Sequence, residues 1–205
     1  MKPEWIAPAR TALLLVDCQV DFGAPHGEMA RRGMDMTAPQ AALAHAAALL
    51  DAARRAAVTP VFVRLLTRPG AESAALREEK RRKGDPDEAD LCVQGTPGAE
   101  FAGVTPRGGE WIVDKSRYSA FNGSNLAARL KAARLDTLVV AGLTTECCVA
   151  SSAWSAFEAD FHVFLAEDAC AAYDSALHHQ TLKALALSGA IALPSGRIAA
   201  IWHNS

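Results

Sequence analysis

Three residues of the sequence have side chains that could act together in nucleophilic catalysis: Asp17, Lys115 and Cys148. A free thiol has a pKa of about 8.5 and is only slightly ionised at neutral pH, so a reactive cysteine needs help to lose its proton. A carboxylate can accept that proton, but its negative charge disfavours the thiolate, whereas a neighbouring ammonium group favours it. The three residue types therefore make a working set of base, cation and nucleophile.

Each of the three residues also has a structural explanation that requires no chemistry. Asp17 could cap a helix or form an ion pair, Lys115 could extend to solvent along its alkyl chain, and Cys148 could be an ordinary buried thiol. Their shared position favours the chemical interpretation, because Asp17 and Lys115 end apolar runs and Cys148 follows a third. Ligands bind at the carboxyl ends of parallel strands, so we expect the three side chains to meet at one edge of a sheet.

The stretch 142–149, Gly-Leu-Thr-Thr-Glu-Cys-Cys-Val, follows an apolar run and precedes a segment of helical period. A strand that passes through a tight turn into a helix presents backbone amides beside the nucleophile, and the positive end of the helix adds to their effect. We therefore expect this turn to hold an oxyanion. A plain N-terminal cap by Thr144 or Thr145 is an alternative that is compatible with this role.

The elements that must position these residues alternate along the chain. Short apolar runs, typical of strands buried on both faces of a parallel sheet, are separated by segments of helical period. The runs are 12–16, 61–66, 111–113, 138–141, 161–165 and 190–193. The alternation predicts the α/β class, with a parallel sheet between two layers of helices. Thr37 and Gln40 predict a capping box at one helix start, and Asp174 predicts an N-cap at another.

Composition limits the classes of partner. The net charge is -2 and the basic residues are scattered, so we expect no nucleic-acid binding. No apolar stretch reaches the roughly 18 residues of a membrane span. A nucleotide-binding module is an alternative for an α/β chain, but neither G-x-G-x-x-G nor G-x-x-x-x-G-K-[ST] follows a strand. The first ten residues lack a signal-peptide core and the cysteines number five, so we expect a cytoplasmic protein with reduced thiols.

We expect a single domain over residues 1–205, interrupted by a charged helix and loop at about 71–95. The favoured interpretation of this insertion is a solvated helix and loop between two strands. A lid over a site and a contact to a second subunit remain alternatives.

Three motifs together resemble the isochorismatase-like cysteine hydrolases, over about residues 11–195. They are Leu-Leu-Val-Asp-Cys-Gln-Val-Asp-Phe at 14–22, Lys-Ser-Arg-Tyr-Ser-Ala-Phe-Asn-Gly-Ser at 115–124, and the stretch 142–149. The departures are Val20 where Asn is usual, Ser124 for Thr, and Glu146 for Asp or Asn. None of them touches Asp17, Lys115 or Cys148.

The resemblance implies a six-stranded sheet in the order 3-2-1-4-5-6, with Asp17, Lys115 and Cys148 catalytic and Cys147 not. It also implies a cis peptide bond between Leu143 and Thr144, and an oxyanion hole made by the amides of Thr144 and Cys148. The implied reaction is the cleavage of a C–N bond in a small amide, ureido or carbamoyl compound through a thioester. Relatives that carry this fold are commonly homodimers or homotetramers.

The resemblance is to metal-free members, such as N-carbamoylsarcosine, ureidoacrylate and biuret amidohydrolases. Metal-binding nicotinamidases carry Asp-x-His after the second strand, where this chain reads Val-Arg-Leu-Leu-Thr-Arg at 63–68. We therefore expect no metal and no cofactor. A nicotinamidase-type enzyme, an isochorismatase-type enzyme and a catalytically inactive oligomeric member of the fold remain alternatives.

Residues that could contact the substrate are less visible in the sequence. Arg64 and Arg117 could each pair with a substrate carboxylate, although surface roles are alternatives for both. His26 could line the pocket from the loop after Asp17. The residues assigned to substrate binding are Gln19, Phe22, Arg64, Tyr118 and Phe121.

Overall fold

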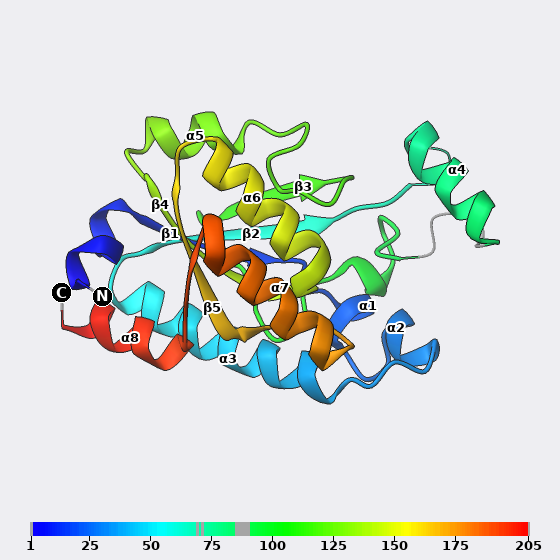
Figure 1. The fold of residues 1–205 in the computed structure, drawn as a ribbon, viewed down its shortest axis with the longest axis horizontal. Coiled ribbons are helices and arrows are strands. Elements are labelled where there is room, and N and C mark those ends of the chain that lie inside the picture. Colours follow the sequence, from blue (N-terminus) through cyan, green and yellow to red (C-terminus); the bar gives the residue numbers. More distant parts are fainter. Residues whose placement is uncertain (1, 69, 71, 85–90, 205) are drawn as a thin grey trace.

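Six parallel strands form the central layer of the structure, a computed structural model that describes residues 2–68, 70, 72–84 and 91–204. Their order is β3-β2-β1-β4-β5-β6, which confirms the predicted topology. The strands are β1 (Thr11–Val16), β2 (Thr59–Leu65), β3 (Trp111–Lys115), β4 (Thr137–Leu143), β5 (His162–Ala171) and β6 (Ile191–Leu193). Figure 1 shows this sheet between its two helical layers.

Helices cover both faces of the sheet. Beside the short 3-10 turns and the π-helical turn Thr145–Val149, the helices are α1 (Val20–Gly23), α2 (Glu28–Arg31), α3 (Thr37–Arg55), α4 (Ala74–Lys83), α5 (Leu126–Ala132), α6 (Ala150–Glu158), α7 (Ser175–Ser188) and α8 (Ser195–His203). Helices α3 and α8 pack on one face, while α5, α6 and α7 pack on the other. The α/β/α prediction is therefore confirmed.

The central strand β1 shows why the chain adopts this arrangement. All six of its residues are fully buried, and its side chains alternate between the two faces. Leu13 and Leu15 join the core under α3 and α8, whereas Leu14 and Val16 join the core under α5 and α6. A strand that is apolar on both faces can be buried only between two layers.

Of the two predicted helix caps, one is confirmed and the other is wrong. The Asp174 carboxylate accepts hydrogen bonds from the amides of Ala176 at 2.7 Å and Leu177 at 3.1 Å, so the predicted cap of α7 is confirmed. The capping box at Thr37 is wrong, because Thr37 is already the first helical residue of α3. Its amide donates instead to the Asp35 carboxylate at 2.9 Å.

Strand β5 is longer than its apolar run predicts. The run ends at Leu165, but the strand continues to Ala171 past two acidic residues. The second of these, Asp168, accepts hydrogen bonds from the amide of Ser195 at 2.6 Å and from its hydroxyl at 3.0 Å. An acidic residue inside this strand therefore anchors the start of α8.

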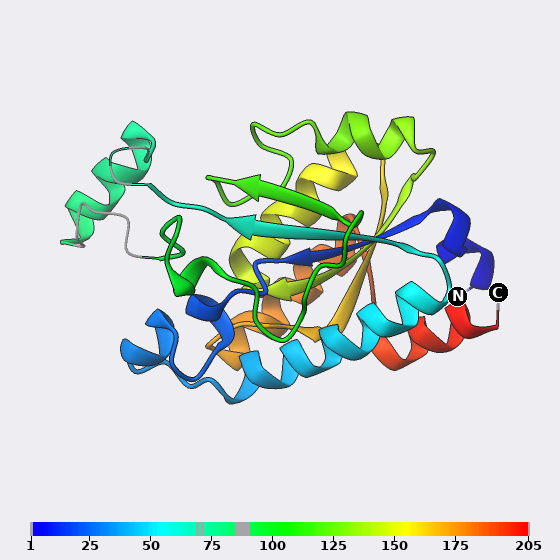
Figure 2. The same ribbon diagram turned by 180° about the vertical axis from the view of Figure 1, so that it is seen from behind.

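The charged segment predicted at 71–95 contains α4, while its residues 71 and 85–90 lie outside the described residues. Helix α4 stands away from the three layers in both views (Figures 1 and 2). The base of the segment is tied to the body, because the Thr67 amide donates to Cys92 O at 3.0 Å and its hydroxyl to Leu91 O at 2.6 Å. Within the described ranges, no helix is long and apolar enough to cross a membrane.

Candidate active site

Asp17, Lys115 and Cys148 meet at the carboxyl ends of three strands. Asp17 directly follows β1, Lys115 is the last residue of β3, and Cys148 lies in the π-helical turn Thr145–Val149 after β4. The Lys115 ammonium Nζ lies 2.7 Å from Asp17 Oδ2 and donates to Cys148 Sγ at 3.3 Å. It also donates to the backbone oxygen of Arg117 at 3.0 Å. The cation therefore bridges the carboxylate and the thiol.

The three groups are withdrawn from solvent. The side chains of Asp17 and Lys115 are fully buried, and Cys148 is 5 % exposed. Burial raises the pKa of Asp17, and the attraction of Lys115 offsets only part of that rise. Burial lowers the pKa of Lys115, but the adjacent Asp17 and Cys148 outweigh it and leave the pKa raised. Burial and the partner's charge therefore act in opposite directions on each group, and the Asp17 carboxylate is more basic than an exposed one.

The thiol of Cys148 keeps its proton in the free protein. Its pKa is raised well above the ordinary value by a hydrogen bond with Cys147, by burial and by the Asp17 carboxylate, and Lys115 offsets only part of this. A preformed thiolate is therefore not what this geometry favours. Removal of the proton by Asp17 during attack is the chemistry that the arrangement allows.

The turn that carries Cys148 is built from special backbone conformations. Gly142 has φ 126°, and a Cβ at this position would lie 1.9 Å from Val16 O, so no other residue fits. The Leu143–Thr144 peptide bond is cis, as predicted. The Thr144 hydroxyl donates to Glu146 Oε1 at 2.8 Å, and the Thr145 hydroxyl lies 2.8 Å from His178 Nδ1 on α7. Both contacts fix the turn beside the thiol.

A cleft of about 900 Å³ opens above Cys148. Its floor includes Thr144, Cys147 and Cys148, and its walls come from the loops after β1, β2 and β3 and from α4. The side chains that line it include Phe22, Arg32, Arg68, Glu72, Leu76, Lys80, Arg117, Tyr118 and Asn122. The thiol therefore lies at the bottom of a space large enough for a small molecule.

A model of the isochorismatase domain matches residues 11–195 of the chain. The chain belongs to the isochorismatase family. The ureidoacrylate amidohydrolase RutB of Agrobacterium fabrum is 29% identical over 182 residues, which cover 82% of this chain and 78% of the relative.

Solved structures agree with this family assignment. An isochorismatase family protein from Desulfovibrio vulgaris superposes with a TM-score of 0.80 and 28% identity, covering 95% of this chain and 99% of that one. The N-carbamoylsarcosine amidase from Thermoplasma acidophilum superposes with a TM-score of 0.71 and 26% identity, covering 91% and 96%.

In this isochorismatase-family protein, two of the five residues assigned to substrate binding, Phe22 and Tyr118, line the cleft. Gln19 does not, because its side-chain amide is bonded to the backbone, to Leu65 O at 2.9 Å and Ala99 O at 2.8 Å. It also accepts a hydrogen bond from the Leu65 amide at 2.8 Å. Gln19 thus joins the loop after β1 to the end of β2.

Arg64 and Phe121 are also not among the residues that line the cleft. The Arg64 guanidinium pairs with Asp114 on the neighbouring strand β3, with Nε 2.6 Å from Oδ1. Phe121 packs against Phe161, with ring centroids 6.0 Å apart. His26, which the sequence left as a possible pocket residue, does not line the cleft, whereas Arg117 does.

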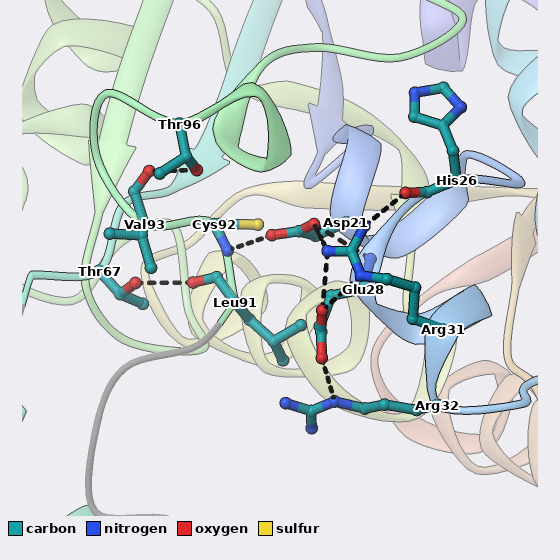
Figure 3. A network of polar contacts seen from close by, with 10 residues as sticks. All are labelled: Asp21, His26, Glu28, Arg31, Arg32, Thr67, Leu91, Cys92, Val93 and Thr96. Atoms are coloured by element: carbon teal, nitrogen blue, oxygen red, sulfur yellow. Dashed lines mark hydrogen bonds and ion pairs between the residues drawn. The ribbon is translucent and has the colours of Figure 1, made fainter.

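Asp21 is a buried residue near the cleft whose structural role the sequence analysis did not assign. Its side chain is buried, and its carboxylate accepts hydrogen bonds from the amides of Cys92 at 2.7 Å and Glu28 at 3.1 Å (Figure 3). It therefore joins α1, α2 and the returning end of the α4 segment, which together shape one wall of the cleft. The signal was present, since Asp21 stands between the apolar residues Val20 and Phe22.

The described part of this family member contains no group of three or more His, Cys, Asp or Glu side chains that could hold a metal ion.

Proposed function

We propose that this protein is a cysteine-dependent amidohydrolase, which cleaves a C–N bond of a small amide, ureido or carbamoyl compound. The observation that carries the proposal is the position of the Lys115 ammonium between Asp17 and Cys148 at the floor of the cleft. Relatives named as a ureidoacrylate amidohydrolase and an N-carbamoylsarcosine amidase support the reaction class.

The first step forms the acyl-enzyme. Asp17 takes the proton of the Cys148 thiol as the sulfur attacks the carbonyl carbon, so a C–S bond forms and the carbonyl oxygen becomes an oxyanion. The amides of Thr144 and Cys148 hold this oxygen. Lys115 stays protonated throughout and stabilises the negative charge that moves from carboxylate to sulfur.

The second step expels the amine. Asp17 returns its proton to the substrate nitrogen, the C–N bond breaks, and ammonia or an amine departs while a thioester remains on Cys148. Asp17 then removes a proton from water, whose oxygen attacks the thioester. The C–S bond breaks, the sulfur regains a proton from Asp17, and an acid or carbamate leaves.

The cleft favours a small substrate with both apolar and polar parts. Phe22 and Tyr118 supply apolar surface, and Arg117 supplies a cation that we assign to a substrate carboxylate where one is present. An acyclic ureido or carbamoyl compound fits this lining. We further propose that the protein works in the cytoplasm as a homodimer or homotetramer, a compartment consistent with its five unpaired cysteines.

The test is ammonia release from amides, ureido acids, biuret and nicotinamide, with Cys148→Ala as the control. We expect release from an acyclic amide or ureido compound without added metal, and none from the control. Nicotinamide as the best substrate, with a metal requirement, would favour a nicotinamidase. Cleavage of a vinyl ether that survives Cys148→Ala would favour an isochorismatase-type reaction, and no turnover at all would favour an inactive member of the fold.

A further inference from the structure

The far wall of the cleft comes from α4 and the turn before it, which supply none of the three reacting groups. The cleft-lining residues of this segment are Glu72, Ser73, Ala75, Leu76, Glu79 and Lys80. A volume of about 900 Å³ exceeds what a single amide group needs above Cys148. The α4 segment therefore faces the part of a substrate that is remote from the bond that breaks.

Glu72 is the unusual residue of this wall. Its side chain is only 7 % exposed, and its Oε1 lies 2.6 Å from the Lys80 ammonium. Its Oε2 is buried and has no hydrogen-bond partner among the residues that the structure describes. Buried carboxylate oxygens normally accept hydrogen bonds, so the bare oxygen marks a missing donor.

The chemistry of the missing donor follows from the charges around it. Lys80 already pairs with one oxygen of Glu72, so we expect the second oxygen to accept a hydrogen bond from a neutral N–H group rather than from a second cation. Glu72 lies just before α4, the helix that stands away from the three layers (Figures 1 and 2), and lines the cleft, so its carboxylate is beside a ligand bound there.

We propose that Glu72 determines specificity by accepting, through Oε2, a hydrogen bond from an N–H group at the remote end of the substrate. This inference rests on the proposed amide hydrolysis and narrows its substrate class. The preferred substrate is a small compound with a scissile amide or carbamoyl group at one end and a second, neutral N–H-bearing group at the other. Diamides and ureido amides belong to this class.

The test compares two molecules of nearly the same shape, succinamide and 4-oxopentanamide, which differ by an amino group in place of a methyl group. Calorimetry measures their binding to the Cys148→Ala protein, in which neither is consumed. We expect succinamide to bind at least tenfold more tightly. In the Cys148→Ala/Glu72→Leu protein the two affinities become equal, because the acceptor is gone.

Two further variants distinguish the loss of the hydrogen-bond acceptor on Glu72 from a general effect of changing the charge of the α4 segment. Glu72→Gln keeps an acceptor oxygen without the charge and should retain part of the preference. Glu78→Gln removes a carboxylate of α4 that pairs with Arg81 and Arg82 and does not line the cleft, so this variant should retain the whole preference for succinamide.

The outcome is independent of turnover. Equal affinities in the Glu72-containing protein, binding of neither compound, or a preference that survives Glu72→Leu would each overturn the assignment of Glu72. Ammonia release by the protein with Cys148 intact is measured in parallel, and its absence would count against the hydrolase proposal alone.

Discussion

The Lys115 ammonium and the Asp17 carboxylate form an ion pair of 2.7 Å in which both side chains are fully buried. A buried pair adds little stability over a well-packed apolar pair, but the loss of one partner leaves an uncompensated charge. Removing one partner of the pair is therefore costly in stability. Its position beside Cys148 suits a role in the proposed reaction.

Lys115→Met should destabilise the protein by about 3 kcal/mol at pH 7, because Asp17 is left buried without its cation. Loss of Lys115 raises the pKa of Asp17 further, so the folded state takes up a proton more readily and the cost shrinks as the pH falls. Urea denaturation at pH 7 and pH 5 measures both effects. The double variant Asp17→Asn/Lys115→Met should recover most of the stability and none of the activity. A Lys115→Met protein as stable as the wild type would contradict the buried pair.

Cys148→Ser should lower ammonia release by a factor of about 10³ or more, because a hydroxyl is far less acidic than a thiol and Asp17 is a weak base. Cys147→Ser is the matched control on the neighbouring residue, and it should keep most of the activity. Mass spectrometry of a quenched reaction should find the acyl group on the peptide that carries Cys148. An acyl group on Cys147 in the Cys148→Ser protein would refute the assignment of Cys148 as the nucleophile.

Asp17→Asn should have opposite effects on turnover and on thiol reactivity. Turnover falls by about 10² to 10⁴, because the general base is lost. Alkylation of Cys148 by iodoacetamide at pH 8 becomes several-fold faster, because the carboxylate that raises the thiol pKa is gone while Lys115 remains. Peptide mapping separates Cys148 from the other thiols. Slower alkylation in Asp17→Asn would show that the carboxylate favours the thiolate, contrary to this account.

The pH dependence of kcat/KM should report Asp17 on its acid limb. The base must be ionised to accept the thiol proton, and burial raises its pKa. Activity should therefore fall as the pH drops through a value above that of an exposed aspartate, which is about 3.9. The basic limb should lie above the ordinary range of lysine, because Asp17 and Cys148 outweigh burial and raise the pKa of Lys115. An acid limb at or below about 3.9 would exclude Asp17 as the base.

Asp21→Ala should loosen the wall of the cleft without touching the reacting groups. Two backbone amides, those of Cys92 and Glu28, lose a charged acceptor, so we expect a loss of about 2 to 3 kcal/mol in stability. KM should rise more than kcat falls, because the α4 segment is anchored at Cys92. Arg31→Ala is the control. Its exposed guanidinium lies 3.9 Å from Asp21 and makes shorter contacts to Glu28 and to His26 O, and exposed ion pairs of this kind contribute little to stability. A change in kcat alone would contradict a positioning role.

The sequence predicted the sheet and the meeting of Asp17, Lys115 and Cys148 because both depend on periodicity. Apolar runs define the strands, and parallel strands bring their carboxyl ends together. Their order was not readable from the runs and came from the family resemblance. The second half of β5 was not predicted, because the acidic residues Glu167 and Asp168 interrupt its apolar run. Asp168 interrupts the run even though it anchors the start of α8.

The hydrogen-bond and ion-pair partners of individual side chains could not be predicted from periodicity. Gln19 lies close to Asp17 in the sequence, but its side chain is hydrogen-bonded to backbone groups. Arg64 lies near a strand end, but its guanidinium is paired with Asp114. A hydrogen-bond partner chosen by three-dimensional proximity leaves no periodic trace in the chain. For the same reason, the charge run of α4 reads as a solvated helix, and nothing in the sequence before it predicts that Glu72 is buried in a cleft wall.

In the proposed enzyme, the reacting groups and the residues that select the substrate come from separate parts of the chain. The rim of the sheet carries the reacting groups, whereas one excursion after β2, fastened at its base through Thr67 and Asp21, supplies the wall opposite them. Mutant libraries confined to the cleft-facing positions of α4 can therefore search for new substrates while the catalytic machinery stays intact. Because the two parts are separate, natural substitutions in the α4 segment can change the specificity without an inactive intermediate.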